Sequence, residues 1–189
     1  MTDKIVKNLN FGQEAKDNVF KGIEKLTKAV SSTLGASGQC VILEDDQGKP
    51  LITKDGVTVA NAITLLDPVE NMGATLLKEA ARKTVQEAGD GTTTATVLAH
   101  SILTEAYSRL KEDSPRNIKN GITNAVDKVV KYLEKKAIDV KGNMLDDVAS
   151  ISCNNDEELG EIIGEAFKAA GENGVVKWNQ LLKIKLNLN

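Results

Sequence analysis

The sequence predicts a mainly α-helical chain that carries one small β hairpin. Apolar residues recur at three- and four-residue steps over most of the chain, which is the spacing of amphipathic helices. Short runs rich in β-branched residues at positions 40–59, bounded by turn-forming residues, favour strands there. Aromatic residues are only 3% of the 189 residues, so the core must be built from aliphatic side chains.

The first helix is expected from Gln13 to about Val30. Gly35 is placed to end it, because glycine readily adopts the left-handed conformation that follows many helices. Residues 5–11, ahead of this helix, alternate loosely and predict a short strand or a tethered arm. The apolar positions of the helix are Val19, Phe20, Ile23, Leu26 and Val30.

A small β unit is expected to follow the first helix. Residues 40–43 and 51–54 are its two arms, joined by a polar turn. Asp55 and Gly56 predict a further turn, and residues 57–59 (Val-Thr-Val) predict another extended segment.

Two long helices are predicted in the middle of the chain. The first runs from about Pro68 to Ala88 and ends at Gly89. The second follows Gly91 and is apolar around nearly its whole circumference, so we expect it to be buried inside a layer of helices.

Three more helices complete the prediction. Ser114 and Pro115 suit the N-cap and the first position of a helix that continues to about residue 133. The polar stretch 139–143 marks a boundary, and short helices are expected near 144–151 and from Asp156 to about Gly171. The tail 182–189 alternates strictly and predicts an amphipathic strand.

Composition excludes several classes of function. The formal net charge is −3 and aromatic residues are few, which argues against nucleic-acid binding. Cys40 and Cys153 lie far apart and His100 is the only histidine, so no zinc site is expected. No apolar run is long enough to span a bilayer and no secretory signal precedes the first helix, so the expected compartment is the cytoplasm.

The strongest chemical motif is the segment 89–96, Gly-Asp-Gly-Thr-Thr-Thr-Ala-Thr, between two predicted helices. A helix N-terminus with glycines offers free N–H groups and a positive dipole end to a phosphate. Asp90 would repel a polyphosphate unless a cation lay between them, which makes it a candidate Mg²⁺ ligand. An ordinary helix junction explains the same local pattern, and the segment is neither a P-loop nor a dinucleotide fingerprint.

Two weaker motifs have plain local explanations. The segment 53–56 (Thr-Lys-Asp-Gly) suits a β-turn, and Thr33-Leu34-Gly35 suits a helix end. In a nucleotide site, Asp55 would face the phosphates and orient water, and the helix end would offer backbone groups to a phosphate or a cation.

Taken together, these segments resemble the group I chaperonins, the ring-forming, ATP-dependent folding machines of bacteria and organelles. The resemblance runs from about Phe11 to about Val176, with the family's order and spacing. The matching stretches are Thr33–Gly35, Ile52–Val57, Glu70–Ala74 and Ala88–Ala99.

The resemblance implies a fold and a domain organisation. Residues 1–139 match the N-terminal part of the helical, ATP-binding equatorial domain. Residues 140–189 match the start of the intermediate domain and include a divergent tail at 177–189. The β unit matches the stem-loop that pairs with terminal strands of a neighbouring subunit in a homo-oligomeric ring.

The resemblance also implies a set of site residues for ATP, Mg²⁺ and K⁺. Asp90 is the Mg²⁺ ligand, Thr33 and Lys54 lie where backbone oxygens hold K⁺, and Asp55 matches a catalytic carboxylate near the γ-phosphate. The family usually has Pro-Lys-Gly where this chain has Ala-Ser-Gly at 36–38, which predicts a looser turn and weaker nucleotide binding. The phosphate site comprises Thr33, Leu34, Gly35, Lys54, Asp90, Gly91, Thr92, Thr93 and Thr94.

The expected function is that of an ATP-dependent chaperonin subunit that assists protein folding, present as its N-terminal portion. The apical domain and the C-terminal equatorial part are expected to be absent, so co-chaperonin and client binding would need that sequence, and little or no ATPase activity is expected of the chain alone. Without the C-terminal part, some of the apolar surface of the helix after Gly91 is expected to face water. The tail is either a genuine strand or the product of a truncated or frameshifted gene. Two alternatives stay open: a non-enzymatic fragment that associates with full-length rings, and an unrelated small nucleotide-binding helical domain.

Overall fold

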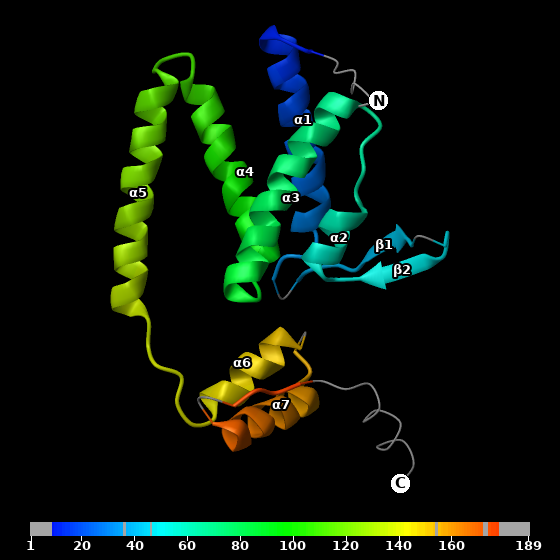
Figure 1. Cartoon of the computed structure of the whole chain (residues 1–189), viewed down its shortest axis with the longest axis vertical. Helices are drawn as coiled ribbons and strands as arrows, with labels where there is room; N and C mark the ends of the chain where they lie inside the picture. Colours follow the sequence, from blue (N-terminus) through cyan, green and yellow to red (C-terminus); the bar gives the residue numbers. More distant parts are fainter. Residues whose placement is uncertain (1–8, 36, 46, 154, 172–173, 178–189) are drawn as a thin grey trace, which may run out of the picture. The chain divides into compact units, whose positions relative to one another are not determined.

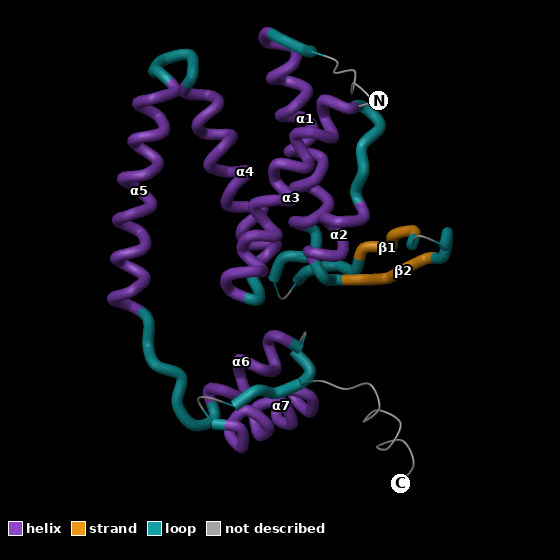
Figure 2. Tube along the Cα trace, viewed as in Figure 1, coloured by secondary structure: helices purple, strands orange, loops and turns teal. Residues whose placement is uncertain are grey.

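The computed structural model describes residues 9–35, 37–45, 47–153, 155–171 and 174–177 (Figure 1). Within these residues the chain forms seven helices and one two-stranded sheet (Figure 2). The elements are α1 (Gly12–Ser31), β1 (Val41–Glu44), β2 (Pro50–Thr53), α2 (Gly56–Ala62), α3 (Pro68–Ala88), α4 (Thr92–Arg109), α5 (Pro115–Lys136), α6 (Met144–Ser152) and α7 (Glu157–Ala170). The mainly helical fold with a β hairpin is therefore confirmed.

The chain divides into two compact units, Met1–Lys128 and Val129–Asn189. The division of the chain falls inside α5, after Lys128, which is eleven residues before the predicted boundary at residue 139. The assignment of equatorial and intermediate domains stays a prediction, and each unit is described by itself.

The first unit is organised around the crossing of α1 and α3. At the crossing each helix contributes a glycine: a Cβ on Gly22 would lie 1.7 Å from the carbonyl oxygen of Glu70, and one on Gly73 would lie 2.0 Å from that of Val19. The backbones can approach this closely only because both positions lack a side chain. The buried aliphatic core beside the crossing consists of Ile23, Leu26, Val30, Val59, Ala60, Ala74 and Leu77.

The ends of α3 follow from side-chain chemistry. The carboxylate of Asp67 accepts hydrogen bonds from the backbone N–H groups of Val69 and Glu70, and Pro68 takes the first helical position, where no N–H is needed. Gly89 ends the helix in the left-handed conformation, with φ of 76°. The predicted bounds of α3 are confirmed.

The β hairpin and the segment after it show one confirmed prediction and one wrong one. β1 and β2 pair antiparallel, which confirms the predicted hairpin, and the register places Val41 opposite Thr53. Residues 57–59, predicted to be extended, instead lie in α2. The side chain of Asp55 caps this short helix, and Val59 is fully buried in the core, so capping and burial outweigh the β-branched composition.

α4 is far more exposed than its apolar composition predicted. Only Thr92 and Thr96 are buried along it, and Leu98 keeps 56% of its surface exposed. In the first unit α4 packs mainly on α1 and α3, so its remaining apolar surface faces outward. α4 is therefore covered on only part of its circumference, and the expectation that the rest of its apolar surface faces water is confirmed.

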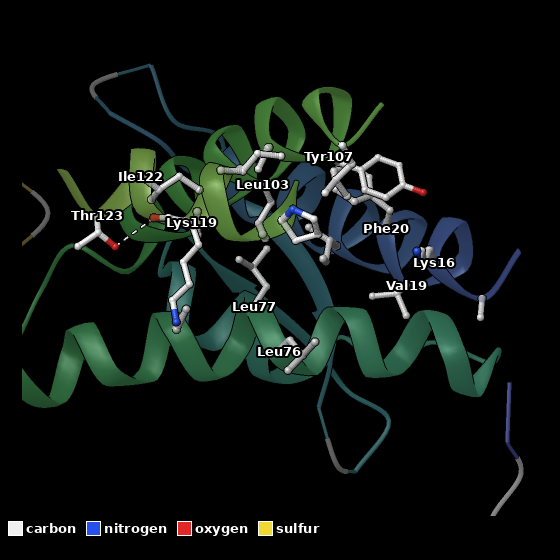
Figure 3. Close-up of a pocket in the computed structure, with 18 residues that line it drawn as sticks. Lys16, Val19, Phe20, Leu76, Leu77, Leu103, Tyr107, Lys119, Ile122 and Thr123 are labelled. Carbon is white, nitrogen blue, oxygen red and sulfur yellow. Dashed lines mark hydrogen bonds between the residues drawn. The ribbon is translucent and has the colours of Figure 1, made fainter. Parts of the chain in front are cut away.

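Apolar side chains of four helices line a pocket beside this surface (Figure 3). Figure 3 shows Phe20 of α1, Leu76 and Leu77 of α3, and Leu103 of α4 around it. The start of α5 adds Ile118 and Ile122, all within the first unit.

We predict that the purified chain self-associates as its concentration rises. The exposed apolar surface of α4 and the pocket beside it favours association between copies of the chain, because association removes this surface from water. Sedimentation velocity across a hundredfold concentration range should show growth of larger species. A monomer at all concentrations, with one sharp two-state unfolding transition, would contradict the prediction.

Near the start of α1 and the end of α4, a polar contact joins the two helices. The Tyr107 hydroxyl donates to Asp17 at 2.7 Å, Gln13 donates to Asp17 at 2.9 Å, and Phe20 stacks on the Tyr107 ring with centroids 4.9 Å apart. The hydrogen bonds from Tyr107 and Gln13 hold the pKa of Asp17 below its ordinary value.

We expect Tyr107→Phe to raise the pKa of Asp17 toward its ordinary value, because the largest cause of the shift is then removed. Because the pKa of Asp17 is lower in the folded chain than in the unfolded chain, its ionisation stabilises the fold at pH values above the unfolded pKa of about 3.9. This contribution is lost as the pH falls through the pKa of the folded state. NMR titration of the Asp17 carboxyl carbon measures the change. Tyr132→Phe is the control, because that ring lies beside Lys136 on α5; an unchanged Asp17 pKa in Tyr107→Phe would refute the assignment.

The second unit contains the end of α5 together with α6 and α7, and the two short helices predicted after residue 143 are confirmed. Asp156 caps α7 by accepting from the N–H of Leu159. Gly160 and Gly164 let α7 approach α6 closely, since a Cβ at either position would lie 2.0 Å from a side-chain oxygen of α6. The predicted strand at 182–189 lies outside the described residues.

No helix in the described part of the chain is both long and apolar enough to cross a membrane.

Candidate functional site

Three chain segments that carry the predicted site residues meet around Thr93. The Thr93 hydroxyl lies 3.2 Å from that of Thr33, which follows the end of α1. A Cβ on Gly56, the first residue of α2, would lie 2.2 Å from the Thr93 hydroxyl oxygen. The structure therefore brings together the end of α1, the β2–α2 junction and the α3–α4 junction.

The α3–α4 junction leaves the first turn of α4 without a side-chain cap. Gly89 and Gly91 both adopt left-handed conformations, with φ of 76° and 87°, and Gly91 is the N-cap. Aspartate side chains cap α2, α3 and α7, whereas none caps α4 in the described structure. The N–H groups at this helix start are therefore available to an external anion, and a Cβ at Gly89 would meet nothing within 4 Å.

Threonine hydroxyls around this helix start have different roles. Thr92 and Thr96 are buried, and the Thr96 hydroxyl donates to the Thr92 carbonyl at 2.8 Å, so both belong to the packing of α4. Thr93 is half-buried at the meeting point of the three segments, and Thr94 is exposed. Thr93 and Thr94 therefore keep hydroxyls near any ligand at the helix start.

Asp90 is exposed immediately before α4. One of its carboxylate oxygens accepts a hydrogen bond from the Gly91 N–H at 2.6 Å. The described residues contain no cluster of three or more His, Cys, Asp or Glu residues able to hold a metal ion. A Mg²⁺ ion at Asp90 would thus take its other ligands from phosphate oxygens and water, which is its usual coordination with nucleotides.

Asp55 lies next to Gly56 and uses both carboxylate oxygens to cap α2. Val57 N–H donates to one oxygen at 3.1 Å, and the N–H and hydroxyl of Thr58 donate to the other at 2.9 and 2.5 Å. These bonds fix the orientation of the carboxylate, which belongs to the residue before Gly56. Lys54, one residue earlier, is exposed.

The segment after α1 differs from the predicted helix end. α1 ends at Ser31, and Gly35 lies four residues further on with φ of 72°. Thr33 is buried and donates its hydroxyl to the Val30 carbonyl at 2.8 Å, whereas Leu34 is exposed. Gly38 N–H donates to the Gly35 carbonyl at 2.9 Å, which closes a turn beside Thr33.

Sequence reasoning missed the part that Gly56 plays. It was assigned to a β-turn, yet its missing side chain is what allows α2 to approach Thr93. The signal was the Asp-Gly pair followed by apolar residues, which also describes a capped helix start.

A protein-family model described as the TCP-1/cpn60 chaperonin family matches residues 26–187. The chain belongs to this family. The match includes every predicted site residue and extends beyond Val176 into the tail.

Chaperonins of fungi and of a bacteriophage are similar to the chain. It is 45% identical over 172 residues to heat shock protein 60 of Emericella nidulans and to the mitochondrial heat shock protein 60 of Ajellomyces capsulatus. These matches cover 90% of this chain and 29% of each relative, so the chain spans less than a third of their length.

Solved chaperonin structures share the fold. The chaperonin gp146 of the Pseudomonas aeruginosa bacteriophage EL, crystallised in the presence of ATP-BeFx, superposes with a TM-score of 0.73 at 30% identity, covering 87% of this chain and 30% of gp146. A group III chaperonin in the open state gives 0.67 at 29% identity, covering 82% of this chain and 31% of that protein.

Proposed function

We propose that the chain is the N-terminal portion of an ATP-dependent chaperonin subunit that assists protein folding. The observation that carries the proposal is the meeting of three loops around Thr93 beside an uncapped helix start. The phosphates of ATP would accept from the first turn of α4, with Asp90 to Thr94 around them and Mg²⁺ between Asp90 and the phosphates. The presence of ATP-BeFx with gp146 supports a nucleotide at this fold.

The remaining site residues take the roles that the family resemblance implies. Backbone oxygens of Thr33 and Lys54 would hold K⁺, and Leu34 and Gly35 would complete the phosphate loop. Asp55 would orient the attacking water near the γ-phosphate. Because both its oxygens already accept bonds from α2, it enters the site with a fixed orientation.

The proposed assembly is a ring of chaperonin subunits in the cytoplasm. The β hairpin is the part proposed to pair with a neighbouring subunit. Ile42 and Ile52 are opposite each other in the hairpin and are 70% and 65% exposed, respectively. Figure 1 shows the hairpin projecting from the helices of its unit. Co-chaperonin and client binding belong to the longer protein, and the chain alone is proposed to hydrolyse little ATP.

Isothermal titration of the purified chain with Mg-ATP, in K⁺ and in Na⁺ buffers, tests the nucleotide site. Saturable binding that weakens without Mg²⁺ or K⁺ is the expected result. Native mass spectrometry of the same samples tests assembly, since a ring subunit should form larger species with Mg-ATP. The absence of binding at millimolar Mg-ATP by a folded chain would refute the proposal.

A second proposal is that the chain is a non-enzymatic fragment that joins full-length chaperonin rings. It is favoured by the open apolar surface of α4 together with the exposed hairpin. Co-expression with a full-length subunit and affinity purification would test it. Ring incorporation without added ATPase activity supports it, and failure to co-purify with or without nucleotide refutes it.

A further inference from the structure

α2 joins the candidate site to the middle of α3. This helix has seven residues, which corresponds to about 10 Å. Its first residue, Gly56, lies against Thr93, and its fourth, Val59, is fully buried in the core. Its last residue is followed by Ile63 in an extended conformation, so the helix has no glycine cap to satisfy its final carbonyls.

Two basic side chains from α3 occupy that uncapped end. The ammonium of Lys78 donates to the Ile63 carbonyl oxygen and lies 3.5 Å from that of Asn61. The guanidinium of Arg82 donates to the Asn61 side-chain oxygen at 3.0 and 3.3 Å, and to Glu79 at 2.9 Å. Positive charge at a helix C-terminus is favourable, because it faces the negative end of the helix dipole.

Lys78 is not an ordinary solvated lysine. It follows the buried Leu77 on α3 and is itself only partly exposed. Burial, and then the charge of Arg82, lower the pKa of its ammonium. Because carbonyl oxygens hold the Lys78 ammonium in this partly buried position, the lysine attaches the end of α2 to α3.

We propose that Lys78 and Arg82 are positioning residues for the nucleotide site: they hold the C-terminal end of α2 on α3 and so keep Gly56, and with it the neighbouring Asp55, in place against Thr93. α2 is too short to bend and Val59 is held in the core, so freeing one end of the helix changes the tilt of the other. Neither basic residue is among those that meet at Thr93. This inference rests on the proposed nucleotide-binding function.

The test compares Lys78→Met and Asn61→Ala with a control, Lys83→Met, each made in the 189-residue chain. Lys83 is exposed on the same helix and its carboxylate partner is Glu87, 3.8 Å away, one turn further along α3. Lys78→Met removes the donor from α3, and Asn61→Ala removes the acceptor of Arg82 from an exposed position of α2 without altering α3. Mg-ATP affinity and amide hydrogen exchange at residues 57–62 are measured for each variant that shows wild-type helicity.

We expect Lys78→Met and Asn61→Ala to weaken Mg-ATP binding by about three- to thirtyfold and to speed exchange in α2, with Lys83→Met unchanged. Lys78→Arg should recover most of the affinity, because its guanidinium still donates to the same carbonyls. Wild-type affinity in both folded test variants would overturn the proposal. If Lys78→Met does not fold, the Mg-ATP affinity and hydrogen exchange of Asn61→Ala decide whether the proposal holds.

Failure of the proposed function gives a different pattern. If the wild-type chain binds no Mg-ATP, the nucleotide role of the site is refuted, and hydrogen exchange decides the positioning role. Faster exchange at Val57 and Thr58 in the test variants than in Lys83→Met would uphold the positioning of Asp55. Equal exchange would overturn it as well.

Discussion

Replacing Gly73 by alanine is expected to destabilise the first unit by about 2–4 kcal/mol. The new methyl group would lie 2.0 Å from the Val19 carbonyl oxygen, which belongs to the backbone of α1 and cannot rotate away. α1 and α3 would have to separate at their crossing, which loosens the packing of Ala74 and Leu77 in the core. The ion pair of Lys25 with Glu70, which also joins the two helices, would be strained too.

Gly121→Ala is the matched control for this prediction. Gly121 lies inside α5, where a Cβ would meet nothing within 4 Å. The same substitution should therefore stabilise the chain by about 0.5–1 kcal/mol, because alanine favours the helix. Urea unfolding followed by circular dichroism measures both variants, and a Gly73→Ala chain as stable as wild type would show that the crossing is not closely packed.

The Asp90→Asn variant is expected to bind Mg-ATP about tenfold or more weakly, which is about 1.4 kcal/mol for each tenfold change. The amide oxygen can still accept from the Gly91 N–H, so the junction keeps its local hydrogen bond while the Mg²⁺ ligand loses its charge. ATP without Mg²⁺ should bind the variant more tightly than wild type, because the repulsion between the carboxylate and the phosphates is removed. Titration calorimetry in Mg²⁺ and in EDTA measures both effects.

Asp113→Asn is the control for Asp90→Asn. Asp113 also lies at a helix junction and accepts from the next backbone N–H, that of Ser114, at 2.7 Å. Asp113→Asn changes the net charge by the same amount as Asp90→Asn. Asp113 is remote in sequence from the three segments that meet at Thr93. Equal weakening of Mg-ATP binding in the two variants would indicate a general charge effect and contradict a magnesium role for Asp90.

Local chemistry accounts for what the sequence predicted well. α3 begins after an aspartate cap and a proline and ends at a left-handed glycine, and each signal acts within a few residues. The same reasoning located β1, β2, α6 and α7. Where a cap and the composition disagreed, as at Asp55 and residues 57–59, composition was given too much weight.

Tertiary features were predicted less well because no local pattern contains them. Thr33 and Thr93 are 60 residues apart, and each motif alone had a plain explanation as a turn or a helix end. The family resemblance, and not the local pattern, joined them into one site. The elements that cover α4 were not predicted for a related reason: an apolar surface indicates that something can pack on it, but not which element does.

The crossing of α1 and α3 has a thermodynamic consequence for any ligand of the first unit. The loops around Thr93 are direct continuations of the core: Thr33 follows α1, Asp90 follows α3, and Gly56 begins a helix whose middle is buried. A ligand that binds there binds only the folded unit, so saturation at a hundredfold excess over Kd would raise its unfolding free energy by about 2.7 kcal/mol. Occupancy and melting temperature are therefore linked quantities, and each can be used to measure the other.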